Sequence, residues 1–337
     1  MYPEMSLVIL TVLAGVGQGM FILLVILDAL FLKSGEVTPH FLTAAAVVSL
    51  VFPLIGMAAS FFHLGNPMRG YKAIFKWKRS WLSREVIFLP AFVGLDMLYL
   101  LLLYSGAPEL YRLFAGFLGI VAAMALYLSS AMLYAAIRFI KEWATALTPI
   151  NFVLFGLTSG AAAATAAAHY TMPGMAIGYL LSYLVAFLAA FSLVMKGLTF
   201  QYNASAYSDI GIKNALGMNN PHIRLMDTGA AYAHYNTKEY FLPMTRRQND
   251  LRQVLVLGIS FFLPLLMALY AAYNPALKLG GLFSTATLLI VTGLILERRL
   301  FFMQGNHIQN LYYGNYRRNV VQNPAVSKAK PGTPQPK

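Results

Sequence analysis

The sequence contains no cysteine among its 337 residues, and only 11% of the residues are charged. Without thiols the chain can form no disulfide, no thiolate nucleophile and no cysteine-ligated zinc or iron–sulfur site. In soluble domains roughly a quarter of the residues are charged. The mean hydropathy of this chain, +0.62, is correspondingly high. These two shortages exclude a soluble enzyme, and they place any iron–sulfur cluster on another subunit.

Long apolar stretches replace the missing charge. A helix of about 20 apolar residues crosses a hydrocarbon core of ~30 Å, and such stretches recur along the chain. They are continuous rather than alternating, which favours helices over a barrel. We therefore predict an all-α polytopic membrane protein, a bundle of eight transmembrane helices with both termini on the same side. The expected spans cover about residues 6–32, 41–62, 85–104, 113–137, 149–168, 175–200, 251–273 and 279–296.

The domain organisation follows from the same pattern. Residues 1–312 form the predicted transmembrane domain, which includes a cytoplasmic loop at residues 202–250. Residues 313–337 form a basic, proline-rich tail with few apolar residues, a composition typical of disorder. No internal repeat of the transporter kind is visible in the sequence.

The basic residues predict the orientation. With this topology, 22 of the 25 lysines and arginines lie on the side of the termini, and only Lys33, Arg112 and Lys278 lie on the other. Because basic residues are retained on the cytoplasmic side during insertion, both termini are predicted to be cytoplasmic, in the inner membrane of a bacterium or archaeon.

The net charge of +13 lies in loops next to the membrane, so it does not indicate nucleic-acid binding. Attraction to anionic lipid and the topology itself explain most of this charge. Some of these basic residues could in addition dock an acidic partner protein. The candidates are Lys76, Lys78, Arg79, Arg224, Lys238, Arg246 and Arg247.

The densest polar link between two spans runs from His63 to Val86. Gly65, Pro67 and Gly70 predict an irregular backbone there. His63 finishes one span and Glu85 starts the next, so both are expected near one pocket at the membrane edge. A histidine and a carboxylate in such a place can bind a quinone, whose carbonyl oxygens need hydrogen-bond donors and whose redox reaction exchanges two protons.

Arg69 and Tyr71 of the same link could supply further donors to a quinone. A structural alternative stays open. In that alternative the histidine only caps its helix through a carbonyl, and the carboxylate pairs with Arg84 or Lys78.

Further polar residues lie within the spans. Asp96 follows Glu85 by 11 positions, which is nearly the same helix face about three turns deeper. The two could form a proton path, or Asp96 could bond to a neighbouring helix or lie near the outer interface. Asp28 is expected in a solvated position near the outer end of the first span. Gln18 lies in a glycine run and the segment Gly160–His169 is rich in small residues, so both predict close helix packing.

The six histidines do not support a haem site, because no two of them fall inside spans at matched depth. Motifs such as HExxH, a Walker loop or GxSxG are also missing from the sequence. We expect no haem, iron–sulfur cluster, molybdenum or self-contained catalytic site on this chain.

Several segments carry a resemblance to a known family. The strings HLGNPMRGYKAI and SWLSREV, the start LTVLAGVGQG of the first helix, NTKEYF at 236–241 and ERRLFFMQGNHIQNLYYG at 297–314 span most of the chain. With these segments the sequence resembles the membrane-anchor subunits of dimethyl sulfoxide reductase and its relatives, the DmsC family within the wider polysulfide-reductase-like group.

The resemblance implies an eight-helix, haem-free anchor for two partners, a four-cluster ferredoxin-like iron–sulfur subunit and a molybdopterin catalytic subunit. It also implies a site for menaquinone or ubiquinone that involves His63 and Glu85. The reductase prototype of the family faces its partners to the periplasm, whereas the charges here place the polar loops in the cytoplasm.

The segments NTKEYF and LYYG are more similar to the branch that serves cytoplasmic sulfite-oxidising molybdoenzymes. We therefore expect electrons to flow from sulfite to quinone. One alternative is a quinol-oxidising anchor of a dimethyl sulfoxide, tetrathionate or polysulfide reductase. The other, in a different class, is a small-molecule or ion transporter, which would need a polar site near mid-membrane, and Gln18 with Asp96 gives weak support for one.

Overall fold

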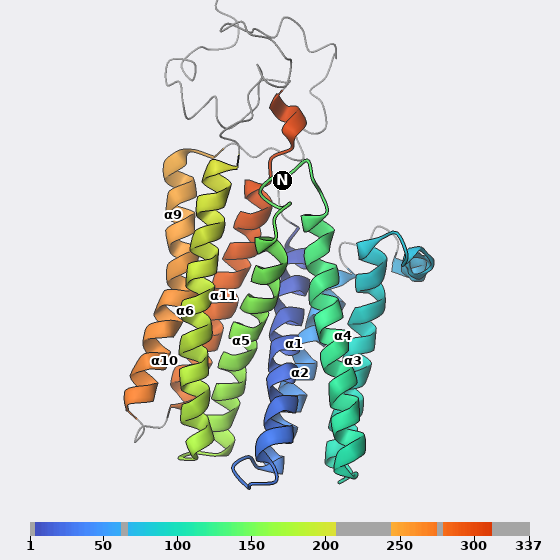
Figure 1. Ribbon diagram of the computed structural model, residues 1–337, viewed down its shortest axis with the longest axis vertical. Coiled ribbons are helices and arrows are strands. Elements are labelled where there is room, and N and C mark those ends of the chain that lie inside the picture. Colours follow the sequence, from blue (N-terminus) through green and yellow to red (C-terminus); the bar gives the residue numbers. More distant parts are fainter. Residues whose placement is uncertain (1–3, 62–66, 207–243, 275–278, 312–337) are drawn as a thin grey trace, which may run out of the picture.

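The computed structural model describes residues 4–61, 67–206, 244–274 and 279–311, and within these ranges it contains helices and no β-strand. Eight of its helical segments are long and apolar enough to cross a membrane. They lie side by side as one bundle (Figure 1). The predicted all-α fold with eight spans is confirmed, and the chain is a multi-pass membrane protein.

Seven spans are single helices, and the remaining one is interrupted. The single helices are α1 (Met5–Phe31), α2 (Pro39–Ser60), α3 (Trp81–Tyr104), α4 (Glu109–Ala135), α5 (Leu147–Thr171), α6 (Ala176–Ser205) and α11 (Gly280–Gln304). The interrupted span joins α9 (Arg246–Leu257), a π-helical turn η2 (Gly258–Phe262) and α10 (Leu263–Tyr273). Two short 3₁₀ helices lie outside the spans, η1 (Pro67–Lys76) and η3 (Ile308–Leu311).

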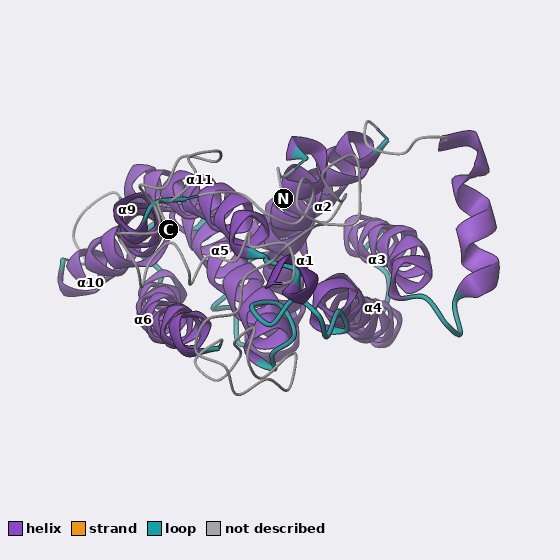
Figure 2. Ribbon diagram, turned by 90° about the horizontal axis from the view of Figure 1, so that it is seen from above, coloured by secondary structure: helices purple, strands orange, loops and turns teal. Residues whose placement is uncertain are grey.

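We call the end of the bundle where α1 begins and α11 ends the proximal end, and the opposite one the distal end. Successive spans run in opposite directions. The spans that begin with α1, α3, α5 and α9 therefore start at the proximal end, and the other four start at the distal end (Figure 1). Viewed from the proximal end, η1 stands outside the bundle, beyond α3 (Figure 2). An even number of spans therefore brings the first and the last described helix ends to one side.

Helices α1 and α5 form the centre of the bundle. In their most apolar windows 72% and 78% of the residues are buried, against 28% in α3. Glycines allow this contact, because a Cβ at Gly19 would collide with the carbonyl oxygen of Gly156 and a Cβ at Gly160 with the backbone of Met20. Gln18 adds a hydrogen bond from Nε2 to the carbonyl of Ala123 on α4, at 2.7 Å. The predicted close packing of these two small-residue segments is confirmed.

Three helices are longer than the apolar stretches predict. Helix α6 continues to Ser205. Helix α11 continues to Gln304, because Glu297, beyond the expected end, forms a buried ion pair with Lys196 of α6 inside the bundle. Helix α4 begins at Glu109, ahead of the expected start, and carries Arg112 on its buried face. Hydropathy alone makes these three helices too short.

The expectation for Asp28 was wrong. Its side chain is not solvated, since only 2% of the residue is exposed. The carboxylate accepts two hydrogen bonds from Arg112, at 2.7 and 2.9 Å, and one from the hydroxyl of Tyr99, at 2.7 Å. A buried carboxylate is retained at this depth because a bidentate guanidinium and a phenol replace its water.

Candidate functional site

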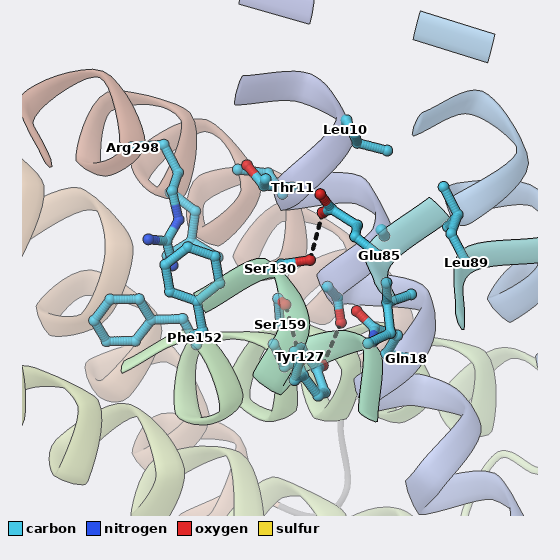
Figure 3. Close-up of a pocket in the computed structure, with 17 residues that line it drawn as sticks. Leu10, Thr11, Gln18, Glu85, Leu89, Tyr127, Ser130, Phe152, Ser159 and Arg298 are labelled. Carbon is cyan, nitrogen blue, oxygen red and sulfur yellow. Dashed lines mark hydrogen bonds between the residues drawn. The ribbon is translucent and has the colours of Figure 1, made fainter. Parts of the chain in front are cut away.

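A small cavity lies between five helices at the proximal half of the bundle (Figure 3). Helices α1, α3, α4, α5 and α11 line it, and its volume is about 20 Å³. This volume admits about one water molecule and is too small for an aromatic ring. The polar residues on its walls are Thr11, Gln18, Glu85, Tyr127, Ser130, Ser159 and Arg298.

Glu85 enters the cavity from the second turn of α3. The helix begins after Ser80, whose hydroxyl accepts a hydrogen bond from the backbone of Ser83 and so fixes the first turn. Glu85 is 6% exposed, and its Oε1 accepts a hydrogen bond of 2.5 Å from Ser130 on α4. Burial with a single hydroxyl donor leaves the carboxylate with unused acceptor positions that face the cavity.

The partners suggested for Glu85 from the sequence are not the ones in the structure. Arg84 donates instead to the backbone carbonyls of Trp77 and Lys78, and its guanidinium lies 4.0 Å from the ring centroid of Trp81. The pairing of Glu85 with Arg84 was therefore wrong, because adjacent residues on a helix point to different sides.

Arg298 approaches the cavity from α11, on the wall across from Glu85 (Figure 3). It is 5% exposed, and its guanidinium carbon lies 3.6 Å from the ring centroid of Phe152. Its Nε is 3.4 Å from Oε2 of Glu297, whose other oxygen accepts from Lys196. This buried cluster thus contains two basic side chains and one acidic side chain, so a formal positive charge remains beside the cavity.

The other polar groups on the walls are engaged in helix contacts. Tyr127 donates to the carbonyl of Gly15 at 2.7 Å, and the hydroxyls of Ser159 and Thr11 donate to carbonyls of their own helices. Gln18 bonds to α4, as described above. Glu85 and Arg298 therefore remain as the two charged side chains with capacity to bind a polar ligand or to exchange a proton.

The structure brings one residue of the predicted quinone set to this cavity. Glu85 lines it, whereas Tyr71 on η1 is 60% exposed and does not. His63 lies outside the described residues, and so does the side chain of Arg69, although its backbone belongs to η1. Ser130 and Arg298, which also line the cavity, are not among the residues predicted from the sequence.

Asp96, the second residue of the predicted proton path, is bound elsewhere. It is completely buried and accepts hydrogen bonds from Ser49 of α2, at 2.9 and 3.2 Å. It lies about 16 Å from Glu85 along α3. Phe92, on the turn between them, packs edge-on against Phe21 of α1. Asp96 thus ties α3 to α2, and it does not line the cavity.

The predicted docking residues divide into two groups. Lys76, Lys78, Arg79, Arg246 and Arg247 are exposed at the proximal end, while Arg224 and Lys238 lie outside the described residues. In the part of the chain that the structure describes, no three histidine, aspartate or glutamate side chains converge in a way that could hold a metal ion.

Known proteins match most of the chain. A family model described as the DMSO reductase anchor subunit (DmsC) matches residues 1–314. One of the sulfite dehydrogenase subunits of Allochromatium vinosum is 30% identical over 332 residues, which cover 93% of this chain and 99% of that protein. The family match contains every residue of the cavity.

Proposed function

The chain belongs to the family of DMSO reductase anchor subunits, and on this premise we propose that it binds quinone for an oxidoreductase complex that it anchors in the membrane. The partners would be an iron–sulfur subunit, which delivers or receives electrons, and a molybdopterin catalytic subunit. The name of the similar protein, a subunit of a sulfite dehydrogenase, supports such an assembly.

One observation carries the quinone proposal. Glu85 and Arg298 are both buried, and they face the same cavity from opposite walls in the proximal half of the bundle. A quinone carbonyl oxygen needs a hydrogen-bond donor, which Arg298 can supply. The hydroxyl of a quinol needs a proton acceptor, which Glu85 can supply. No other carboxylate in the described ranges lines this cavity.

The size of the cavity sets a requirement on binding. A volume of about 20 Å³ accommodates a water molecule but no ring, so the side chains around it must separate when a quinone ring enters. Phe152 forms part of the wall and already stacks on Arg298. In our proposal the ring takes its place between this aromatic wall and Glu85, while Ser130 holds the carboxylate in position.

For the direction of the reaction we propose sulfite oxidation with quinone reduction. On the catalytic partner, sulfite and water would give sulfate, two electrons and two protons. At the cavity, quinone would take up two electrons from the iron–sulfur partner and two protons, and so become quinol. The similarity to a protein of a sulfite dehydrogenase supports this direction. The alternative is the reverse flow, from quinol to dimethyl sulfoxide, tetrathionate or polysulfide.

We also propose that the proximal end faces the cytoplasm and docks the partners. The excess of basic residues on that side supports the orientation. The exposed residues Lys76, Lys78, Arg79, Arg246 and Arg247 would meet an acidic partner surface. A reporter fused after Lys337 should be active only in the cytoplasm, and periplasmic activity would reverse the proposed side.

A pair of substitutions on α3 tests the site. Glu85→Gln keeps the size of the side chain but removes the proton acceptor, so we expect quinone-coupled turnover of the purified complex to fall about a hundredfold. Asp96→Asn removes the other buried carboxylate of the same helix, which does not line the cavity. Its quinone-coupled turnover should stay close to that of the unsubstituted complex.

An artificial acceptor that takes electrons directly from the iron–sulfur partner provides the control. With this acceptor, both variants should oxidise the substrate at the unsubstituted rate, because assembly and the catalytic partner are unchanged. If Glu85→Gln supports normal quinone turnover, or if both variants lose it equally, the cavity is not the quinone site.

A further inference from the structure

A second, larger cavity lies between α9 and α11, near the proximal end. Its volume is about 190 Å³, and it is separate from the cavity at Glu85. The walls combine two arginines with apolar side chains, namely Arg252, Arg299, Leu255, Val256, Leu296, Leu300 and Met303. We call it the α9–α11 groove.

Among the residues that the structure describes, the guanidinium groups of this groove have no oxygen acceptor. Arg252 donates to the thioether sulfur atoms of Met244 and Met303, at 2.7 and 3.8 Å. Arg299 is exposed and has no hydrogen bond or ion pair with any residue that the structure describes. A guanidinium carries five N–H donors, and thioether sulfur is a weak acceptor. Two positive side chains thus share one groove, and neither forms an ion pair with a carboxylate of the described residues.

The acidic residues closest in sequence are engaged elsewhere. Glu297 is buried between Lys196 and Arg298. Asp250 lies 3.8 Å from Arg246, one helical turn away along α9. Neither carboxylate lines the groove. The charge of the groove is therefore not balanced by these two residues of the chain.

The position of the two arginines corresponds to a membrane interface. Arg252 follows the start of α9 by six residues, and Arg299 precedes the end of α11 by five. At 1.5 Å per residue both lie about 8–9 Å inside the helix ends. Deeper along the same face of α9, Leu255 lines the groove and is 44% exposed. An occupant must therefore present an anion at one end and an apolar chain at the other.

We propose that the α9–α11 groove is a binding site for an anionic phospholipid. The phosphate oxygens would accept hydrogen bonds from Arg252 and Arg299, and an acyl chain would lie against Leu255 and Leu296. Basic pockets between transmembrane helices recognise anionic head groups in this way. This inference does not depend on quinone binding, because the groove shares no residue with the cavity at Glu85.

Lipid retention tests the proposal directly. The full-length protein, with any partner subunits that accompany it, is purified in mild detergent and supplied with equal amounts of phosphatidylglycerol and phosphatidylcholine. Native mass spectrometry then counts the retained lipids. We expect phosphatidylglycerol to be retained preferentially, and the double variant R252Q/R299Q to bind it about tenfold more weakly or worse.

Two controls make the result decisive. Arg138→Gln removes the same charge from an exposed position between α4 and α5, outside both the groove and the proposed docking residues, and it should leave retention unchanged. The single variant Arg299→Gln alters an exposed side chain, so it should fold normally and still weaken binding several-fold.

Three outcomes would overturn the proposal. The first is equal retention of the two lipids by the unsubstituted protein. The second is an equal loss in Arg138→Gln and in the groove variants, which would indicate a diffuse surface effect. The third is displacement of the lipid by inorganic phosphate at millimolar concentration, or a groove variant that retains its lipid but loses a partner protein. Either result would assign the arginines to a different ligand.

Discussion

The two ends of the bundle each contain buried charges, but the charges are arranged differently. At the distal end, Asp28 receives three hydrogen bonds from Arg112 and Tyr99, and the acid and the base balance. At the proximal end, the cluster of Lys196, Glu297 and Arg298 has one basic group in excess and adjoins a cavity.

This difference suggests that the distal charges stabilise the fold, whereas the proximal charges can also bind a ligand. Every oxygen of the distal carboxylate has a donor at 2.9 Å or less, so that cluster offers nothing to a ligand. The proximal cluster and Glu85 retain unused donors and acceptors beside an internal space. Intramembrane charges are expensive, and of these two clusters the proximal one leaves capacity for binding.

The largest expected effect comes from breaking the distal cluster. Asp28→Asn leaves the guanidinium of Arg112 buried without its counter-charge, which destabilises folded proteins by about 3 kcal/mol or more. We expect a markedly lower melting temperature of the protein in detergent. Quinone-coupled turnover per assembled complex should be unaffected. A selective loss of quinone turnover with normal melting would reverse the roles of the two ends.

Replacing Arg298 is expected to lower the stability of the protein less than Asp28→Asn does, but to lower quinone-coupled turnover more. The variant Arg298→Met keeps an apolar stem against Phe152 and leaves Lys196 paired with Glu297. Because the excess charge disappears, the melting temperature should fall less than in Asp28→Asn. Loss of a hydrogen bond from a charged donor, worth about 1.5–3 kcal/mol, should lower quinone-coupled turnover roughly ten- to hundredfold.

The kinetics of Arg298→Met can be checked by measuring turnover as a function of quinone concentration and, in parallel, with the artificial acceptor. Normal quinone kinetics together with a strongly lowered melting temperature would make this cluster structural, like the distal one. The contrast between the two ends would then disappear.

The smallest effect is expected for a charge pair at the surface. Lys33 and Glu109 form a salt bridge of 2.9 Å at the distal end, and the lysine side chain is 76% exposed. Exposed pairs contribute about 0–1 kcal/mol. Glu109→Gln should therefore leave both melting temperature and quinone turnover within error of the unsubstituted protein. If Glu109→Gln lowered the melting temperature as much as Asp28→Asn, burial would not explain why the two charge pairs contribute differently to stability.

Hydropathy was sufficient to predict the eight spans, because the length of an apolar run decides whether a helix crosses the membrane. It failed where a charge continues a helix. The last span was expected to end at residue 296, but α11 continues to Gln304. Glu297 lies beyond that expected end, and its partner Lys196 lies 101 positions earlier, so their pairing is not visible in a linear pattern.

The candidate site was predicted in part for a related reason. Glu85 could be found because it is a carboxylate at the start of an apolar span, beside an unusual polar link. Ser130 and Arg298 could not, because serine is common in apolar helices and the arginine resembled a topology signal. A lysine inside an apolar run, as at Lys196, is the one local signal that could have drawn attention to the proximal cluster.

The central claim is that quinone binds at the cavity between Glu85 and Arg298, and covalent labelling tests it most directly. A photoreactive quinone analogue is activated on the purified complex, and the labelled peptides are identified by mass spectrometry. We predict labels on the proximal halves of α3 and α11, lost when excess unmodified quinone competes. Labelling confined to the distal end, or labelling of the cavity helices that excess quinone does not reduce, would contradict the claim.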